Sequence, residues 1–215
     1  MMGDRDYRSL IKNSIESLGR ELEVNIDSTN NNIIHLEEVV GCLRRAYYNR
    51  KDPIKEEQGG FSELISGLLR KLGYGSERAS YDIGGMTLNG SADMMADNAI
   101  ILFRPATDEL KNPRAGDLLY LNSCMWMYDR TDGIIVYITG DRRESSFSLT
   151  RNKKMFEETV RRVRVLGDLL NDGKVPIVEP SSDCERCQYY QRCFTKQKES
   201  KQLTLSALLG MDKNE

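Results

Sequence analysis

Hydrophobic residues recur at helical spacing in five parts of the chain. Apolar side chains separated by three or four positions predict helices over residues 4–23, 36–49, 61–72, 115–128 and 152–170. In the first of these, the apolar face is formed by Leu10, Ile11, Ile15, Leu18 and Leu22. Pro53 follows the second helix and Gly173 follows the last, and both residue types are typical of helix ends.

Between the third and fourth predicted helices, the pattern changes to that of short strands. Three strand candidates follow one another, at residues 77–83, 86–96 and 99–104. They are separated by Gly84-Gly85 and by Asp97-Asn98, and two-residue separators of this kind are typical of β-hairpins. A β-branched strand is predicted over residues 133–139, and residues 145–149 are a candidate to pair with it.

The order of these elements predicts an α/β fold. A helix, three strands, a helix and a strand are buried most economically as one mixed sheet with helices packed on it. This order matches the αβββαβ core of restriction-endonuclease-like nucleases. We expect an N-terminal helix and loop over residues 1–30, the α/β domain over residues 31–199, and a C-terminal tail over residues 200–215.

Composition narrows the class of protein. Hydrophobic residues make up 39% of the chain and charged residues 30%, as in soluble globular proteins. No apolar run approaches the ~18 residues that span a bilayer, and the N-terminus lacks the apolar region of a signal peptide. We therefore expect a cytoplasmic protein that does not bind membranes.

The formal net charge is −2, so no overall positive field indicates a nucleic-acid partner. The basic residues are nevertheless concentrated in two segments, residues 44–55 and 151–164. These segments are either solvated helix faces or, if they flank a cleft, surfaces for phosphate contact.

Three of the five cysteines form a compact motif. Cys184, Cys187 and Cys193 have the spacing C-x2-C-x5-C, and thiolates are soft ligands that suit an iron–sulfur cluster or zinc. An odd number of cysteines and the lack of a secretion signal argue against a disulfide framework.

Such a site needs a fourth ligand. Cys42 is the best distant candidate, and it would tie the two ends of the chain together. The alternative is His35, which would complete a zinc site of three cysteines and one histidine. The fifth cysteine, Cys124, lies in an apolar predicted helix and is expected to be a small buried hydrophobic residue.

The surroundings of these cysteines resemble the CRISPR-associated RecB-like nuclease family, over most of residues 34–195. Cys42 lies in the segment Gly-Cys-Leu-Arg-Arg-Ala-Tyr-Tyr, and the C-x2-C-x5-C motif follows near the C-terminus. The family belongs to the PD-(D/E)XK superfamily, so the resemblance implies a [4Fe–4S] cluster on Cys42, Cys184, Cys187 and Cys193. It also implies a metal-dependent DNA nuclease, often acting on single-stranded ends.

Some catalytic motifs of the family are present. Gly90-Ser-Ala-Asp93 matches the G-x-x-D motif, and residues 59–63 resemble G-x-x-x-H with Glu63 in the place of the histidine. The resemblance implies that Asp93 and Glu63 hold Mg²⁺ or Mn²⁺, the metals that would activate water for hydrolysis.

The E-x-K motif is not kept. Leu102 stands where the glutamate belongs and cannot ligate Mg²⁺, while Arg104 replaces the catalytic lysine with a planar cation. In the next helix, Tyr120 and Cys124 replace the Gln and Tyr of the Q-x-x-x-Y motif. Either the centre has lost nuclease activity or another acid has taken over, for which the candidates are Asp97, Asp108 and Asp117.

The tail carries a further motif. Gln202, Leu205, Leu208 and Leu209 have the spacing of peptides that dock on sliding clamps as one helical turn. The alternative is an amphipathic end helix that packs on its own domain.

Three functions follow as hypotheses. The first is a cluster-bearing RecB-like DNA-binding protein with a degenerate nuclease centre, which binds single strands or ends or supports a nuclease or CRISPR partner protein. The second is an active Mg²⁺- or Mn²⁺-dependent single-strand exonuclease with a rearranged site. The third is a zinc-stapled adaptor that joins proteins and does not contact DNA.

Overall fold

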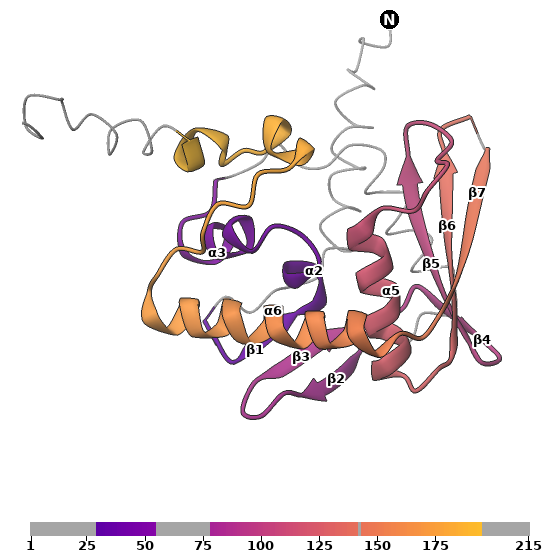
Figure 1. The fold of residues 1–215 in the computed structure, drawn as a ribbon, viewed down its shortest axis with the longest axis horizontal. Helices are drawn as coiled ribbons and strands as arrows, with labels where there is room; N and C mark the ends of the chain where they lie inside the picture. The colour runs from indigo at the N-terminus through magenta and orange to yellow at the C-terminus, as the bar shows by residue number, and fades with distance from the viewer. Residues whose placement is uncertain (1–28, 55–77, 142, 195–215) are drawn as a thin grey trace, which may run out of the picture.

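The computed structural model describes residues 29–54, 78–141 and 143–194 (Figure 1). The helices predicted over residues 4–23 and 61–72 lie outside these ranges. Within them, no helix is both long enough and apolar enough to cross a membrane.

The described part of the chain contains both helices and strands. They are β1 (Ile33–His35), α2 (Leu36–Val39), α3 (Leu43–Lys51), β2 (Ala79–Asp82), β3 (Thr87–Gly90), β4 (Met94–Ala96), β5 (Ala99–Ala106), α5 (Ala115–Met127), β6 (Asp132–Thr139), β7 (Glu144–Thr150), α6 (Lys153–Asp172) and a 3₁₀ turn (Ser182–Arg186). The helices predicted over residues 115–128 and 152–170 are confirmed. The prediction of one continuous helix over residues 36–49 is wrong, because this segment forms two helices. α2 ends at Val39 and α3 begins at Leu43.

The fold is α/β with mixed sheets, as predicted from the order of the elements. One sheet has the strand order β1-β3-β2 and the other β4-β5-β6-β7. β1 runs parallel to β3 and β5 parallel to β6, whereas the other neighbours are antiparallel. The expected hairpins at Gly84-Gly85 and Asp97-Asn98 and the pairing of β7 with β6 are all confirmed.

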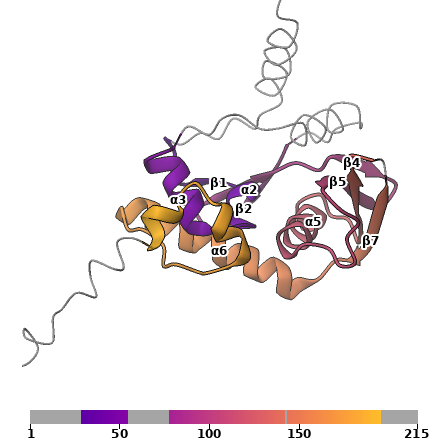
Figure 2. The same cartoon turned by 90° about the horizontal axis from the view of Figure 1, so that it is seen from above.

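The described strands form two sheets, so the prediction of one sheet was wrong for them. The prediction of one continuous strand over residues 86–96 was also wrong. That stretch forms β3 in one sheet and β4 in the other, and Ser91, Ala92 and Asp93 connect them. The two sheets therefore lie side by side rather than as one layer (Figure 2).

Two long helices join the sheets. α5 packs on β5 and β6, and it approaches β6 so closely that a Cβ on Gly133 would lie 2.7 Å from Leu121 Cδ1. α6 runs across α2, α3 and α5 (Figure 1). Its ends follow the sequence signals, because the Asn152 side chain caps the first turn and Gly173 takes a left-handed conformation after the last. Cys124 is fully buried in α5, as predicted.

A buried ion pair fixes β1, α2 and α3 relative to one another. The Arg50 guanidinium donates from Nε to Glu38 Oε1 and from Nη2 to Glu38 Oε2, both at 2.6 Å. It also donates to the carbonyl oxygens of Asn30 and Ile33, and Glu38 accepts from the backbone N–H of His35. Two-point charged bonds of this kind are strong and directional, so this pair sets how α2 meets α3.

Replacement of Arg50 by alanine should destabilise the domain strongly. The change would leave the Glu38 carboxylate buried without its cation, which typically costs about 3 to 5 kcal/mol. Urea denaturation measures the effect. The matched control is Arg45→Ala on the exposed side of the same helix, which should change stability by less than about 0.5 kcal/mol; equal effects of the two variants would contradict the importance of the pair.

Candidate functional site

Asp93 is buried in the connection between the two sheets. The residue is 3% exposed, and its Oδ2 accepts from the Phe103 N–H at 2.9 Å and from Arg104 Nη1 at 2.7 Å. Gly90, the first residue of the G-x-x-D motif, lies so near Leu36 that a Cβ would be 3.1 Å from Leu36 Cδ2. This connection therefore packs closely against Leu36 at Gly90 and bonds to β5 through Asp93.

Arg104 of β5 lies between two carboxylates. Its Nη1 binds Asp93, its Nε lies 3.2 Å from Asp117 Oδ1, and its guanidinium carbon lies 5.0 Å from the ring centre of Tyr120. Burial by itself would lower the pKa of Arg104, but Asp93, Tyr120 and Asp117 raise it above its usual value. The arginine is therefore a fixed cation inside an acidic cluster.

The remaining position of the E-x-K motif is apolar. Leu102 is completely buried two residues before Arg104 and offers no ligand atom. In the described part of the chain, no three His, Cys, Asp or Glu side chains come together in a way that could hold a metal ion. The described residues at this centre therefore do not fit a divalent metal, because a guanidinium already neutralises the carboxylates.

Of the three acids considered as substitutes, Asp117 lies at this centre. Its Oδ2 accepts from the Tyr137 hydroxyl at 2.7 Å, and that hydroxyl in turn accepts from the Arg114 N–H at 2.9 Å. Burial, followed by the hydrogen bond to Asp117, raises the pKa of Tyr137 to about 12. Asp97 and Asp108 are both exposed, Asp97 in the left-handed turn between β4 and β5.

Tyr120 and Cys124 of α5 face the connection that carries Asp93. The Tyr120 hydroxyl lies 2.9 Å from the Ser91 carbonyl oxygen and 3.1 Å from Glu37 Oε1. Burial raises the pKa of Tyr120 and that of Cys124 well above their usual values, so both stay protonated and can donate. Glu37 was missed by the sequence analysis, because no motif marks it and its link to Tyr120 spans the chain.

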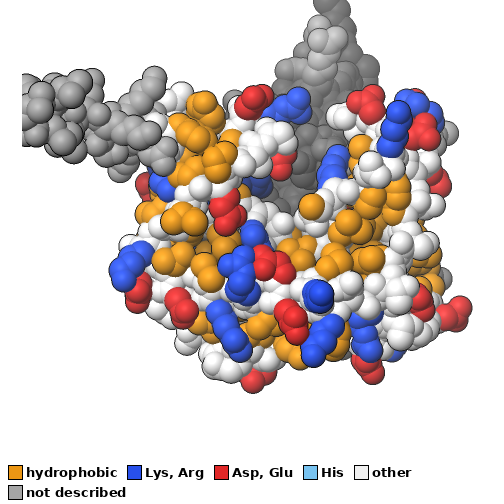
Figure 3. All heavy atoms as spheres, in the orientation of Figure 1, with side chains coloured by type: hydrophobic (Ala, Val, Ile, Leu, Met, Phe, Trp, Pro, Cys, Tyr) orange, Lys and Arg blue, Asp and Glu red, His pale blue; other side chains and the backbone are white. Residues whose placement is uncertain are grey.

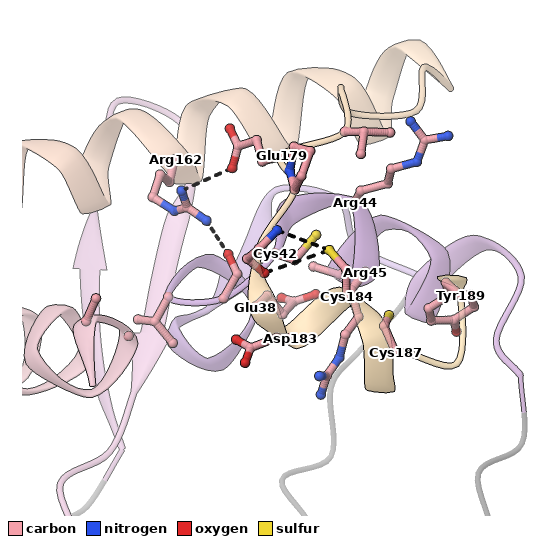
Figure 4. A pocket seen from close by; sticks show the side chains of 18 of the residues that line it. Glu38, Cys42, Arg44, Arg45, Arg162, Glu179, Asp183, Cys184, Cys187 and Tyr189 are labelled. Carbon is pink, nitrogen blue, oxygen red and sulfur yellow. Dashed lines mark hydrogen bonds and ion pairs between the residues drawn. The ribbon is translucent and has the colours of Figure 1, made fainter. Parts of the chain in front are cut away.

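The four cysteines proposed as cluster ligands line one pocket of about 1110 Å³. Cys42 comes from the residue before α3, Cys184 and Cys187 from the 3₁₀ turn and its end, and Cys193 from the helical turn that follows. Figure 4 shows Cys42, Cys184 and Cys187 around the same space. The structure thus brings the two ends of the domain together at these residues.

Tyr189 anchors the cysteine segment on α3. It is completely buried, and its hydroxyl donates to Asn49 Oδ1 at 2.8 Å and accepts from the Ile54 N–H at 3.2 Å. Its ring lies 5.1 Å from that of Tyr48, and Arg192 forms an ion pair with Asp52 at 2.7 Å. Contacts on both sides of Tyr189 therefore fix where Cys187 and Cys193 lie.

The turn before Cys42 is held from α6. Arg162 donates to the carbonyl oxygens of Val39 and Gly41, and its Nη1 lies 3.9 Å from Glu179 (Figure 4). Arg44 similarly donates to the Pro176 carbonyl oxygen at 3.1 Å. These arginines belong to the two basic segments, so part of that charge organises the pocket.

The sulfur atoms influence one another. Burial raises the pKa of Cys193, Arg44 lowers it, and the nearby Cys187, Cys42 and Cys184 raise it further. The Ser181 N–H donates to Cys184 Sγ at 3.4 Å, as an amide can to a thiolate ligand. Thiols are typical donors to a soft metal or a cluster, but in the described part of the chain these four do not form a group that could hold a metal ion.

His35, the alternative fourth ligand, does not line this pocket. It is 2% exposed, and neither ring nitrogen has a hydrogen-bond partner among the residues that the structure describes. Burial, followed by Arg78, lowers its pKa, so the ring is a neutral part of the core. Glu63 and the tail residues Gln202, Leu205, Leu208 and Leu209 lie outside the described residues, and the roles expected of them remain predictions.

No protein-family model and no curated protein matches this chain. Among solved structures, SSO0001 is similar with a TM-score of 0.60 and 16% identity, over 87% of this chain and 97% of that one. A phage related exonuclease from Haemophilus somnus 129PT has a TM-score of 0.47 and 13% identity, over 64% and 91% of the two chains. The alkaline exonuclease LHK-Exo from Laribacter hongkongensis gives 0.49 and 11%, over 66% and 89%. The first similarity shows a shared fold, and identities this low assign no activity.

A double-mutant cycle should show that Arg104 and Asp93 are coupled. Arg104→Met would leave the buried Asp93 carboxylate without its guanidinium partner, at a cost of about 3 to 5 kcal/mol in unfolding free energy. The further change Asp93→Asn should recover much of this loss, because it removes the charge that needs compensation.

Denaturant unfolding of both single variants and the double variant measures this coupling. The control is Arg161→Ala, which breaks an exposed ion pair with Glu158 and should cost at most about 1 kcal/mol. Strictly additive losses in the cycle would show that the two side chains act independently.

Proposed function

We propose that this chain is a cluster-bearing, RecB-like DNA-binding protein of the PD-(D/E)XK superfamily with a degenerate nuclease centre. It would act in CRISPR adaptation or in DNA replication and repair. The observation that carries this proposal is that Cys42, Cys184, Cys187 and Cys193 all line one pocket, in a sequence context that resembles this family.

The pocket would hold a [4Fe–4S] cluster through these four thiolates. Thiolates gathered around one space repel each other, and iron would remove that cost by binding them. Hydrogen bonds from Arg162, Arg44 and Tyr189 fix the segments that carry these cysteines. Binding would link residues 42 and 184 across the domain, and cluster binding would thereby contribute to folding.

The Asp93 centre would lack the means to cut DNA. Hydrolysis of a phosphodiester in this superfamily depends on a divalent metal that activates water and stabilises the leaving oxygen. Arg104 provides positive charge between Asp93 and Asp117, but a guanidinium has no open coordination position and does not acidify water. Arg104 would thus keep a positive charge at the centre, but it would not activate water as a divalent metal does.

Phosphate contacts would come from exposed basic residues of the two basic segments. They are Arg45, Lys51, Lys153, Lys154, Arg161 and Arg164. Figure 3 shows Lys and Arg side chains interspersed with acidic ones on the face that α6 crosses. A mixed surface of this kind favours moderate, salt-sensitive binding rather than a strong nonspecific hold on DNA.

Anaerobically purified protein should be brown. We expect an absorption band at about 400 nm and about four irons per chain, as for a thiolate-held cluster. Cys42→Ser and Cys193→Ser should each lose iron, whereas Cys124→Ala should keep it because Cys124 lies in the core away from the pocket. Colourless protein with one zinc per chain would favour the adaptor hypothesis instead.

Cluster-replete protein should bind labelled single-stranded DNA and leave it intact in the presence of Mn²⁺. Binding should weaken steeply as salt increases, because phosphate contacts release counterions. Gel shifts at several salt concentrations and a cleavage time course provide the measurement. Cleavage that disappears in Asp93→Ala would contradict the degenerate centre, and protein that neither binds nor cuts DNA would contradict the DNA-related role.

A further inference from the structure

The sheet β4-β5-β6-β7 ends in a regular strand with one open edge. β7 pairs with β6 without interruption, from Glu144 opposite Ile138 to Thr150 opposite Asp132. In the part of the chain that the structure describes, no strand pairs with its other side. β7 lies at the outer end of this sheet, on the side of the molecule away from α3 (Figure 1).

The direction of the backbone groups in β7 follows from the bonds at its two ends. The Arg143 carbonyl oxygen accepts from the Thr139 N–H at 3.0 Å, and the Arg151 N–H donates to the Thr131 carbonyl oxygen at 2.8 Å. Residues of an antiparallel strand alternate in the side to which they direct their N–H and C=O groups. Odd-numbered residues of β7 therefore bond to β6. The residues that direct their groups to the open edge are Glu144, Ser146, Ser148 and Thr150, and all four have exposed side chains.

This edge lacks the features that usually prevent strand pairing. Natural edge strands are commonly protected by lysine, proline, a bulge or a very short length. β7 has seven residues, Glu-Ser-Ser-Phe-Ser-Leu-Thr, with neither lysine nor proline and with a continuous register to β6. Its small serine side chains leave a second backbone free to approach.

We propose that β7 pairs with β7 of a second copy of this chain, antiparallel and around a two-fold axis at Phe147. This register places Glu144 opposite the partner's Thr150, and Ser146 opposite the partner's Ser148. All four of these residues direct their backbone groups to the open edge, so each facing pair can exchange two hydrogen bonds. The two four-stranded sheets would then form one continuous sheet with an isologous interface.

The side chains are compatible with this symmetric register. Phe147 faces its own copy and Ser145 faces Leu149, while the single charged residue of the strand, Glu144, faces a threonine. Beyond the strand, Arg143 would lie opposite Arg151, but each has its own acid, Asp141 at 2.7 Å and Asp129 at 2.8 Å. A self-complementary strand without facing like charges favours a second copy over an unrelated partner.

Proline at position 148 provides the sharpest test. Ser148→Pro would remove an outward N–H donor while the bonds to β6 remain, which is where strands tolerate proline. Sedimentation at several protein concentrations should show a dimer for the native chain and for the control Ser148→Ala, and a folded monomer for Ser148→Pro. A native chain that stays monomeric, or a folded Ser148→Pro variant that stays dimeric, would overturn the proposal.

Amide hydrogen exchange of the native chain decides the question even if the proline variant does not fold. In the dimer, the amides of Ser146 and Ser148 should be protected, and dilution should remove this protection. The amides of Phe147 and Leu149 bond to β6 and should stay protected at every concentration. Equal, concentration-independent exchange at Ser146 and Ser148 would contradict β7 pairing. The outcome is independent of the cluster and of DNA binding, since β7 contributes to neither site.

Discussion

A single guanidinium joins the parts of the domain that meet at its acidic centre. Arg104 extends from β5 and binds Asp93, which lies in the connection between the two sheets, and Asp117, which lies in α5. Since burial of either carboxylate without a cation would be costly, the approach of β5, α5 and this connection depends on Arg104. The same contact explains why the chain leaves β3 and enters a second sheet at this point, because Asp93 must turn inward to reach the guanidinium.

The short helix α2 connects this centre to the cysteine pocket. Glu37 reaches the Tyr120 hydroxyl beside Asp93, whereas its neighbour Glu38 holds Arg50 of α3. Arg162 then binds the turn between α2 and Cys42. Consecutive residues of one helical turn point in different directions, so a four-residue helix can contact both sites. The position of Cys42 and that of the Tyr120 hydroxyl are thus set by the same small element.

Sequence patterns predicted the helices and hairpins that depend on local apolar spacing and on residues typical of helix ends and turns. α5, α6 and the hairpins follow from apolar spacing, Asn152, Gly173 and the two-residue turns, and the C-x2-C-x5-C spacing indicated that a distant cysteine was needed. The division into two sheets was not predictable, because the break at Asp93 depends on Arg104, which belongs to another strand. For the same reason, the sequence did not indicate Glu37, and it could not show which of Asp97, Asp108 and Asp117 lies near Arg104. These contacts form only when β5, α2 and α5 pack together.

The two candidate sites differ in the source of the cation that would stabilise them. At the acidic centre, the neutralising cation is part of the polypeptide, so it cannot dissociate and its position is fixed when β5 folds. At the cysteine pocket, burial and the nearby Cys187, Cys42 and Cys184 raise the pKa of the Cys193 thiol, so a bound metal or cluster would favour its thiolate. An arginine in the place of a metal ion would keep positive charge at such a centre, but it would not supply the hydrolytic chemistry. Under the proposed function, dependence on a cofactor would fall on the pocket that Cys42 and Cys193 line.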